Sequence, residues 1–84
     1  MTPICAKCGK PMYCEKTGRA VVEYHDEKTP FRLTHADEFR CKTCGAAVCI
    51  MASEPYAEFG VNAMFHECVA LEEKQRNVVR VVYT

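Results

Sequence analysis

Cys5-Ala6-Lys7-Cys8-Gly9 and Cys41-Lys42-Thr43-Cys44-Gly45 are the two stretches of sequence that decide the fold of this chain. Each places two cysteines two residues apart and follows the second with glycine, the residue that turns most tightly. Two such knuckles supply four thiolates, and four thiolates suit one tetrahedral zinc ion. A site filled by four protein ligands leaves no coordination position for chemistry. The sequence therefore predicts a structural zinc site made by Cys5, Cys8, Cys41 and Cys44.

The same tetrahedral sulfur geometry also suits iron. Both CxxCG knuckles resemble those of rubredoxins, and that resemblance implies an electron-carrying iron site. The aromatic core of rubredoxins usually includes tryptophan, whereas this sequence contains none. We therefore expect zinc, and a rubredoxin-like electron carrier stays as an alternative.

The chain has 84 residues and no linker rich in proline, glycine or serine. We expect a single zinc-ribbon domain over 1–84, with the ribbon in 1–53 and a loop, a helix and a terminal strand in 54–84. A domain of this size buries only about 60–65% of its unfolded surface and needs further stabilisation. Structural zinc contributes an apparent ~10–16 kcal/mol in small zinc peptides. We therefore expect the metal-free chain to be largely unfolded.

The seven cysteines are better explained by metal binding than by a disulfide framework. Their number is odd, four of them lie in the knuckles, and no apolar secretory segment follows Met1. No apolar run approaches the ~20 residues that span a bilayer. We expect a soluble, cytoplasmic protein with no membrane partner.

The charges are balanced, with 11 basic and 11 acidic side chains. This balance argues against a protein held mainly by phosphate contacts. Basic residues nevertheless gather in the first half, interleaved with aromatic ones: Lys10, Lys16, Arg19, Lys28, Arg32, Arg40 and Lys42, with Tyr13, Tyr24 and Phe31. Such interleaving is typical of surfaces that bind single strands. Nucleic-acid binding, with Arg32 and Arg40 as contacts, is therefore a second alternative.

Alternation and turn residues predict short strands in the first half of the chain. Residues 12–16 and 20–25 are expected to form a hairpin about a turn at Thr17-Gly18-Arg19. A polar turn at 26–30 then leads to a strand at 31–35. Together with a C-terminal helix, these hairpins predict a small α+β fold that zinc staples at one end.

After an irregular step at Ala36-Asp37, the chain enters the second knuckle and leaves it as a strand at 46–51. That strand is apolar on both faces, which is typical of a central or covered strand. Its expected cover is an amphipathic helix from Asn62, the predicted N-cap, to about Asn77. The apolar face of this helix is expected to contain Met64, Phe65, Cys68 and Leu71.

The remaining segments are a loop and a tail. Residues 55–60 are expected to form a loop anchored by Tyr56 and Phe59. The valine-rich residues 78–84 predict a final strand. If that strand lies at a sheet edge, it offers a docking surface for another strand, either of a partner or of a second copy in a homodimer.

Three further cysteines and one histidine raise the question of a second site. Cys14 and Cys49 follow their knuckles at similar distances and could meet across the ribbon, and Cys68 lies near His66. Buried cysteines usually act as small apolar side chains, so we expect core positions and keep a second metal or redox site as an alternative. The sequence places no nucleophile or carboxylate to make a histidine a catalytic base. We therefore expect no enzyme activity and no small-molecule substrate.

Beyond the knuckles, the chain resembles small uncharacterised zinc-ribbon proteins of bacteria and their phages. The resemblance spans about 4–75 and rests on both knuckles and on three other stretches: Val21-Val22-Glu23-Tyr24, Ala36-Asp37-Glu38-Phe39-Arg40-Cys41 and Pro55-Tyr56-Ala57-Glu58. It implies the same four cysteine ligands. The resemblance supplies no activity of its own. From the closed cysteine site we expect a non-enzymatic binding module that contacts a larger protein as an adaptor, regulator or inhibitor. A phage origin and a target in the host machinery are expected only from the resemblance.

Overall fold

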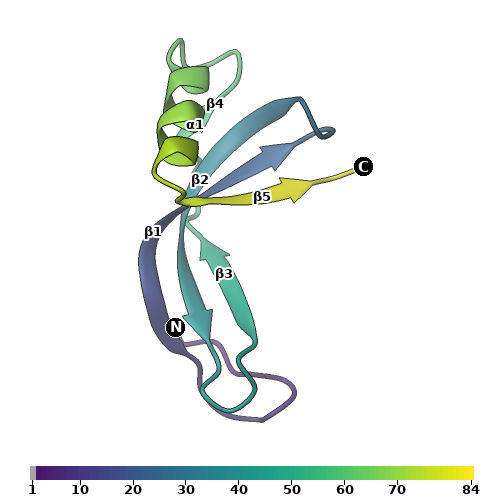
Figure 1. The fold of residues 1–84 in the computed structure, drawn as a ribbon, viewed down its shortest axis with the longest axis vertical. Coiled ribbons are helices and arrows are strands. Elements are labelled where there is room, and N and C mark those ends of the chain that lie inside the picture. Colours follow the sequence, from purple (N-terminus) through teal and green to yellow (C-terminus); the bar gives the residue numbers. More distant parts are fainter. Residues whose placement is uncertain (1) are drawn as a thin grey trace.

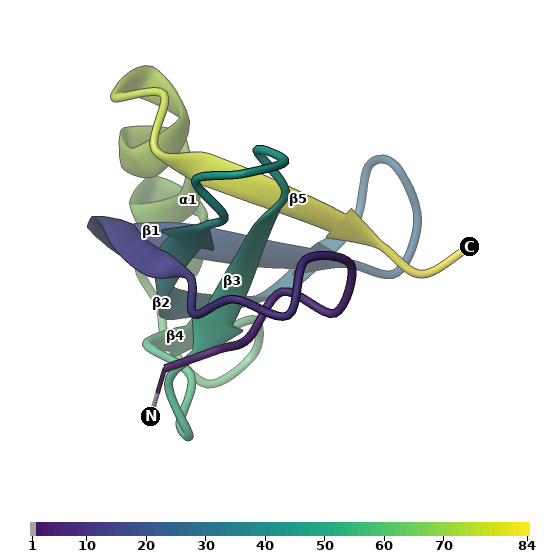
Figure 2. The ribbon, with the colours of Figure 1, turned by 90° about the horizontal axis from the view of Figure 1, so that it is seen from below.

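The computed structural model describes residues 2–84 and shows a small α+β fold with a curled sheet and one helix (Figure 1). The elements in chain order are β1 (Tyr13–Tyr24), β2 (Pro30–Arg40), β3 (Ala47–Met51), β4 (Ala57–Glu58), α1 (Phe65–Lys74) and β5 (Val78–Val82). The five-stranded sheet has the order β3-β2-β1-β5, and β4 also pairs with β2. Figure 2 looks along the long axis, with the N-terminal loop and the loop before β3 in the foreground. The expected class of fold, small α+β, is confirmed.

The turn of the first hairpin lies later in the sequence than predicted. Thr17-Gly18-Arg19 is not a turn, because β1 continues through these residues alongside β2. Gly18 has a φ of +70° and the register shifts between Lys16 and Arg19, so the segment is an irregularity within a long strand. The side chain of Asn77, far away in the sequence, donates to the Gly18 carbonyl oxygen over 2.8 Å. Contacts with distant parts of the chain therefore hold this segment in an extended conformation, although its own residues favour a turn.

The true hairpin turn follows β1, at the polar stretch that was expected to be the second turn. A carboxylate oxygen of Asp26 accepts the Lys28 N–H at 2.8 Å and the Thr29 hydroxyl at 2.9 Å. The N–H of His25 donates to the Thr29 carbonyl at 2.9 Å and closes the loop. In such turns the aspartate side chain accepts hydrogen bonds from nearby residues, and these bonds replace continued pairing between the strands.

The predicted irregular step at Ala36-Asp37 and the predicted central position of the strand after the second knuckle are also wrong. β2 continues through Ala36 and Asp37, where it pairs with β3. β3 is an edge strand, because β1 occupies the other side of β2. Val48, Ile50 and Met51 are therefore 43–45% exposed. No helix covers them, since α1 packs at the other end of the sheet (Figure 1).

The helix is shorter than predicted and begins at Phe65. Asn62 is not its N-cap: the Asn62 side-chain oxygen instead accepts the N–H of Glu58 at 2.9 Å. The buried face contains Phe65 and Val69, whereas the predicted face residues Met64 and Leu71 are exposed. The interior face is thus rotated toward Val69 relative to the predicted one.

The main core lies between α1 and the upper part of the sheet. Its buried members are Ala20, Val22, Tyr24, Leu33, Ala57, Phe65 and Val69. The loop expected to be anchored by Tyr56 and Phe59 is instead anchored by Ala57 in β4, which is 3% exposed, while both aromatic side chains are at least 60% exposed. Small size lets Ala57 fit under the helix next to β2.

The final strand is integrated into the fold. β5 runs parallel to β1, and Val78 packs against the main core. The phenol of Tyr83 donates to Glu23 Oε2 over 2.7 Å. Glu23 is 1% exposed and also accepts two hydrogen bonds from Arg32, both 2.8 Å. These charge-assisted bonds fasten β5 to the centre of the sheet.

Candidate metal centre

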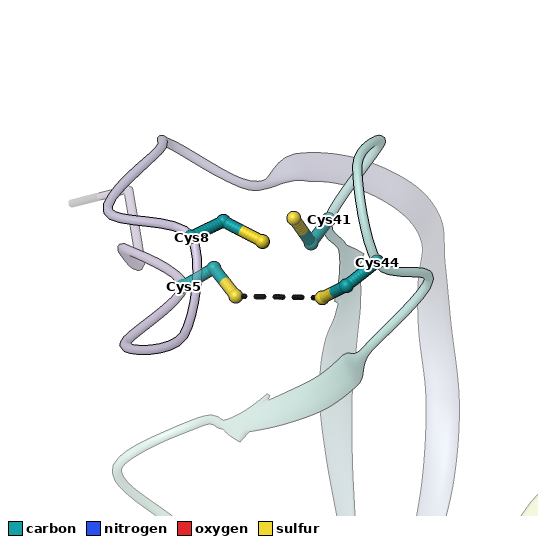
Figure 3. Close-up of side chains that lie close together, drawn as sticks. All are labelled: Cys5, Cys8, Cys41 and Cys44. Carbon is teal, nitrogen blue, oxygen red and sulfur yellow. Dashed lines mark hydrogen bonds between the residues drawn. The ribbon is translucent and has the colours of Figure 1, made fainter.

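Two loops at the lower end of the molecule bring the four knuckle cysteines together (Figure 3). Cys5 and Cys8 precede β1, and Cys41 and Cys44 lie between β2 and β3. The four sulfur atoms all lie within 4.8 Å of one another, and Cys5 Sγ is 3.6 Å from Cys44 Sγ. A tetrahedron with zinc–sulfur bonds of about 2.3 Å has sulfur–sulfur edges of about 3.8 Å. The donor set therefore fits one tetrahedral metal ion.

The two knuckles have the same backbone hydrogen bonds. In the first, Cys5 N–H donates to the Lys10 carbonyl at 2.9 Å, and Gly9 N–H donates to the Cys5 carbonyl at 2.7 Å. In the second, the corresponding pairs are Cys41 with Ala46 at 2.8 Å and Gly45 with Cys41 at 2.9 Å. Both glycines have positive φ, +68° and +78°, a region that other residues enter only with strain. This shared turn sets each pair of sulfurs in matching positions.

Backbone amides and neighbouring thiols shift the pKa values of Cys41 and Cys8 in opposite directions. The backbone N–H groups of Cys44 and Thr43 stabilise the Cys41 thiolate and lower the pKa of Cys41 to about 6. The hydrogen bond to the Cys44 side chain, followed by burial, raises the pKa of Cys8 to about 12. The protein groups alone therefore favour the thiolate form of Cys41 and the thiol form of Cys8. A bound cation removes this conflict, because it stabilises every ligand in its thiolate form.

The cluster is packed against very little apolar material. Cys5 and Cys41 are buried, and they form a small second core with Met12, against which Phe39 packs. Cys44 is exposed at the rim. All four donors come from the protein, so the arrangement suits a structural metal or a one-electron iron site rather than a metal that binds substrate.

The other three cysteines were expected at core positions, with a second metal or redox site as the alternative. Cys14 is exposed rather than in the core, and within the part of the chain that the structure describes the three do not form a second site. Cys14 and Cys49 lie in β1 and β3, with β2 between them, so they cannot meet as the sequence suggested. Two strand spacings separate them by about 10 Å. Cys68 packs against the main core at the other end of the molecule. Within residues 2–84, the knuckle quartet is the one group of three or more metal-ligating side chains.

The arginines proposed as nucleic-acid contacts have partners within the protein. Arg32 forms the two hydrogen bonds to buried Glu23, and Arg40 pairs with Glu15 and donates to the Gly45 carbonyl at 2.8 Å. Arg19 lies 3.2 Å from Glu38. These three guanidinium groups connect neighbouring strands and are already engaged.

Sequence reasoning missed the role of Glu23. A signal was present, because this carboxylate stands in the middle of the apolar strand Val21-Val22-Glu23-Tyr24. A charge at such a position needs a partner once it is buried. Arg32 supplies it from the opposing position in β2, and together with the Tyr83 hydrogen bond lowers the pKa of Glu23.

Among residues 2–84, no helix is both long and apolar enough to cross a membrane. Comparison of the chain with protein families, curated proteins and solved structures finds no match. The geometry therefore identifies this chain as a small α+β protein whose four clustered cysteines form a candidate metal site.

Proposed function

We propose that this chain is a non-enzymatic zinc-ribbon module that binds another protein. The observation that carries the proposal is the closed quartet of Cys5, Cys8, Cys41 and Cys44, whose four sulfurs fit one tetrahedral ion. Such a site stabilises a fold without offering a position for substrate. Its zinc joins two loops that otherwise share only a small apolar core. From its resemblance to small uncharacterised zinc ribbons of bacteria and phages, we further propose that the module is phage-encoded and acts in the cytoplasm on a host protein.

The apolar surface supports a protein partner. Several large apolar side chains are more than half exposed, among them Ile4, Tyr56, Phe59, Val61, Met64 and Leu71. Phe59, Val61 and Met64 lie within six residues of one another between β4 and α1, and concentrated apolar exposure of this kind marks interaction sites. The engaged arginines offer no comparable support for nucleic acid, so we propose no such function.

The β5 edge supports strand addition as one mode of contact. Ala20 N–H donates to the Asn77 carbonyl and Tyr83 N–H donates to the Tyr24 carbonyl, so alternate residues of β5 face β1. The backbone groups of Val78, Arg80 and Val82 consequently point away from the sheet. A strand of a partner or of a second copy could pair there.

The first test is native mass spectrometry with metal analysis on the purified chain. The proposal predicts one zinc per chain and no visible colour. One bound iron, which absorbs visible light when ferric, would instead support the electron-carrier alternative.

The second test uses the zinc-loaded chain, tagged at its N-terminus, as bait in a lysate of its native cell. We expect a stoichiometric protein partner that is retained after nuclease treatment. The matched bait is Cys41→Ser, which removes one ligand and should recover no partner. Recovery of nucleic acid alone, or of no partner by the zinc-loaded bait, would count against the proposal.

A further inference from the structure

The strand β3 forms one edge of the sheet and carries none of the features that usually protect such an edge. Figure 1 shows it on the outer side of β2, in the lower half of the molecule. Its sequence, Ala47-Val48-Cys49-Ile50-Met51, contains no charge and no proline, and its pairing with β2 has no register shift. Exposed edges are commonly protected by a charge, a proline or a bulge, because unpaired backbone groups recruit other strands. β3 is therefore an edge that is open to pairing.

The hydrogen bonds at the two ends of β3 show which of its backbone groups are unpaired. The Ala46 carbonyl accepts the N–H of the residue after β2 at 2.8 Å, and the Ala52 N–H donates to a β2 carbonyl at 2.9 Å. Because backbone direction alternates along a strand, the even-numbered residues between them also face β2. The N–H and C=O groups of Ala47, Cys49 and Met51 therefore point away from the sheet. Within residues 2–84, no loop backbone hydrogen-bonds to these groups.

A second β3 that runs antiparallel to the first completes this edge in one register. When Cys49 lies opposite Cys49 of the second copy, Ala47 of each strand lies opposite Met51 of the other. Every outward-facing residue of β3 is then in a hydrogen-bonded pair, and each pair exchanges two N–H···O=C bonds. A shift of two residues in either direction leaves one outward-facing residue of each strand without a partner in β3. The symmetric register has a two-fold axis, so the pairing closes as a dimer.

The side chains of β3 are complementary to themselves in the same register. On one face of the sheet, Val48 of each copy lies opposite Ile50 of the other, in the positions where cross-strand side chains come closest. On the other face, Met51 of each copy lies opposite Ala47. Val48, Ile50 and Met51 are all exposed in the single chain, so the pairing removes apolar area from water. No charged side chain of β3 is present to repel the second copy.

The opposite edge of the sheet, at β5, does not have this self-complementarity. Arg80 lies at the centre of β5, with its guanidinium group 4.5 Å from the centroid of the Tyr24 ring and 2.8 Å from the Glu27 carbonyl. An equivalent antiparallel pairing of two β5 strands would place the two Arg80 residues opposite each other. Like charges directly opposite each other destabilise a sheet. Of the two edges, β3 is therefore the one whose sequence suits a second copy of this chain.

We propose that β3 pairs with β3 of a second copy and forms a two-fold dimer with one sheet continuous across both chains. A contact made by five residues of each strand buries less than the ~1,200–2,000 Å² of a standard interface. The dimer is consequently weak and forms at high protein concentration. This inference goes beyond the proposed function, because β5 and the segment between β4 and α1 stay free for another protein.

Sedimentation velocity of the metal-loaded chain, from micromolar to millimolar concentration, tests for the dimer. Amide hydrogen exchange at the two ends of this range tests the register. Val48 and Ile50 face β2, so their amides should exchange slowly at every concentration. The amides of Ala47, Cys49 and Met51 should exchange fast in dilute solution and slowly in concentrated solution. This alternation is specific to pairing at the open side of β3, because non-specific association does not distinguish alternate residues.

Matched variants locate the contact. Cys49→Pro removes an outward-facing N–H without removing a bond to β2, and Ile50→Lys places a charge opposite Val48 of the second copy. Each should weaken the dimer about tenfold or more. Val82→Lys introduces the same charge at a partly exposed position on β5 and should leave the dimer unchanged. Retention of the metal and of the wild-type circular dichroism spectrum shows which variants are folded, and Ile50→Lys suffices if the proline variant is not.

Several outcomes would overturn the inference. A chain that stays monomeric up to millimolar concentration would remove it. Concentration-dependent protection of Val78, Arg80 and Val82 would assign self-association to β5, and equal weakening by Val82→Lys and Ile50→Lys would show that the contact is not selective. Species larger than a dimer would show that the association does not close. None of these results bears on recovery of a protein partner by the metal-loaded bait, so the proposed function would stand or fall separately.

Discussion

The two ends of the molecule are stabilised by different physics. The upper end has a core of seven buried side chains between α1 and the sheet. The lower end buries Met12, Cys5 and Cys41, with Phe39 packed beside them. One end therefore depends on removing apolar area from water, and the other places four cysteines where they could hold a metal ion.

This difference shows how a short chain can form an elongated molecule although its main apolar core fills only one end. The principal extents are 42 × 25 × 23 Å, so the molecule is elongated. β1 and β2 run through both ends and connect them mechanically. A metal ion held by the four cysteines would join the far ends of these strands, where few apolar side chains are present.

Removal of one knuckle thiolate is expected to have the largest effect on the folded chain. Cys41→Ser leaves three thiolates and should release the ion. We expect loss of cooperative unfolding across the whole chain, because β1 and β2 are shared and the upper core is small. Circular dichroism with amide hydrogen exchange measures this loss. Cys14→Ser is the control, since Cys14 is an exposed cysteine outside the quartet and its replacement should keep one metal and the wild-type stability.

Persistent protection of α1 and of residues 20–24 in Cys41→Ser would mean that the upper core folds alone. The two ends would then be independent units that merely share strands.

The upper end is tested by Phe65→Ala. Phe65 is 1% exposed, and truncation of a buried phenylalanine costs about 3–5 kcal/mol. We expect this loss in urea unfolding of the metal-loaded chain. Phe59→Ala is a matched control, because Phe59 is 62% exposed and its truncation should change the free energy of unfolding by about 0.5 kcal/mol or less. Similar losses for the two variants would contradict the location of the core.

Glu23 tests the electrostatic link between the sheet and the final strand. Glu23→Gln removes the charge that accepts bonds from Arg32 and Tyr83, so we expect a loss of about 1.5–3 kcal/mol at pH 7. Because these partners lower the pKa of Glu23 from its ordinary value of 4.5, its contribution is complete above that pH. The contribution disappears as the pH falls through the lowered pKa.

The difference between wild type and Glu23→Gln, measured by urea unfolding at a series of pH values, should therefore shrink in acid. Taking the difference cancels metal release, which both proteins share. A gap that stays constant from pH 7 to strongly acidic conditions would show that the carboxylate charge contributes nothing.

Arg76 tests the smallest effect, at the C-terminal end of α1. Its φ of +56° is left-handed, and the bonds Asn77 N–H to Glu72 O and Arg76 N–H to Glu73 O form a Schellman motif. Glycine is favoured at this position, so Arg76→Gly should stabilise by up to about 1 kcal/mol. A thermal melt should rise by a few degrees, roughly 4–8 °C for the full 1 kcal/mol. Gln75→Gly, where φ is −82°, should instead lower it.

Short-range patterns in the sequence predicted some features well. The spacing of cysteines and the glycine after each knuckle predicted the cluster, because these residues act through local turns. The valine-rich tail predicted a strand, and Phe65 and Cys68 were correctly expected on the inner side of the helix. All of these depend on neighbours within a few positions.

Predictions that needed a distant partner were less successful. Gly18 looked like a turn residue until Asn77 and β2 held the strand extended. The strand 46–51 looked central because of its apolar residues. Strand order depends instead on which strands pair, and β1 lies between two neighbours whereas β3 is at the edge. Asn62 looked like a helix cap and instead closes the loop between β4 and α1.

Residue types at short spacing were enough to predict which four cysteines cluster, the helix near the C-terminus, and the need of so small a domain for support beyond its apolar core. Three features follow instead from the folded arrangement: the cysteine cluster and the apolar core lie at opposite ends, Glu23 is paired in the interior, and Phe59, Val61 and Met64 face solvent. Burial and exposure depend on which surfaces meet after the chain has folded back on itself. That information lies in long-range packing, which periodicity along the chain does not contain.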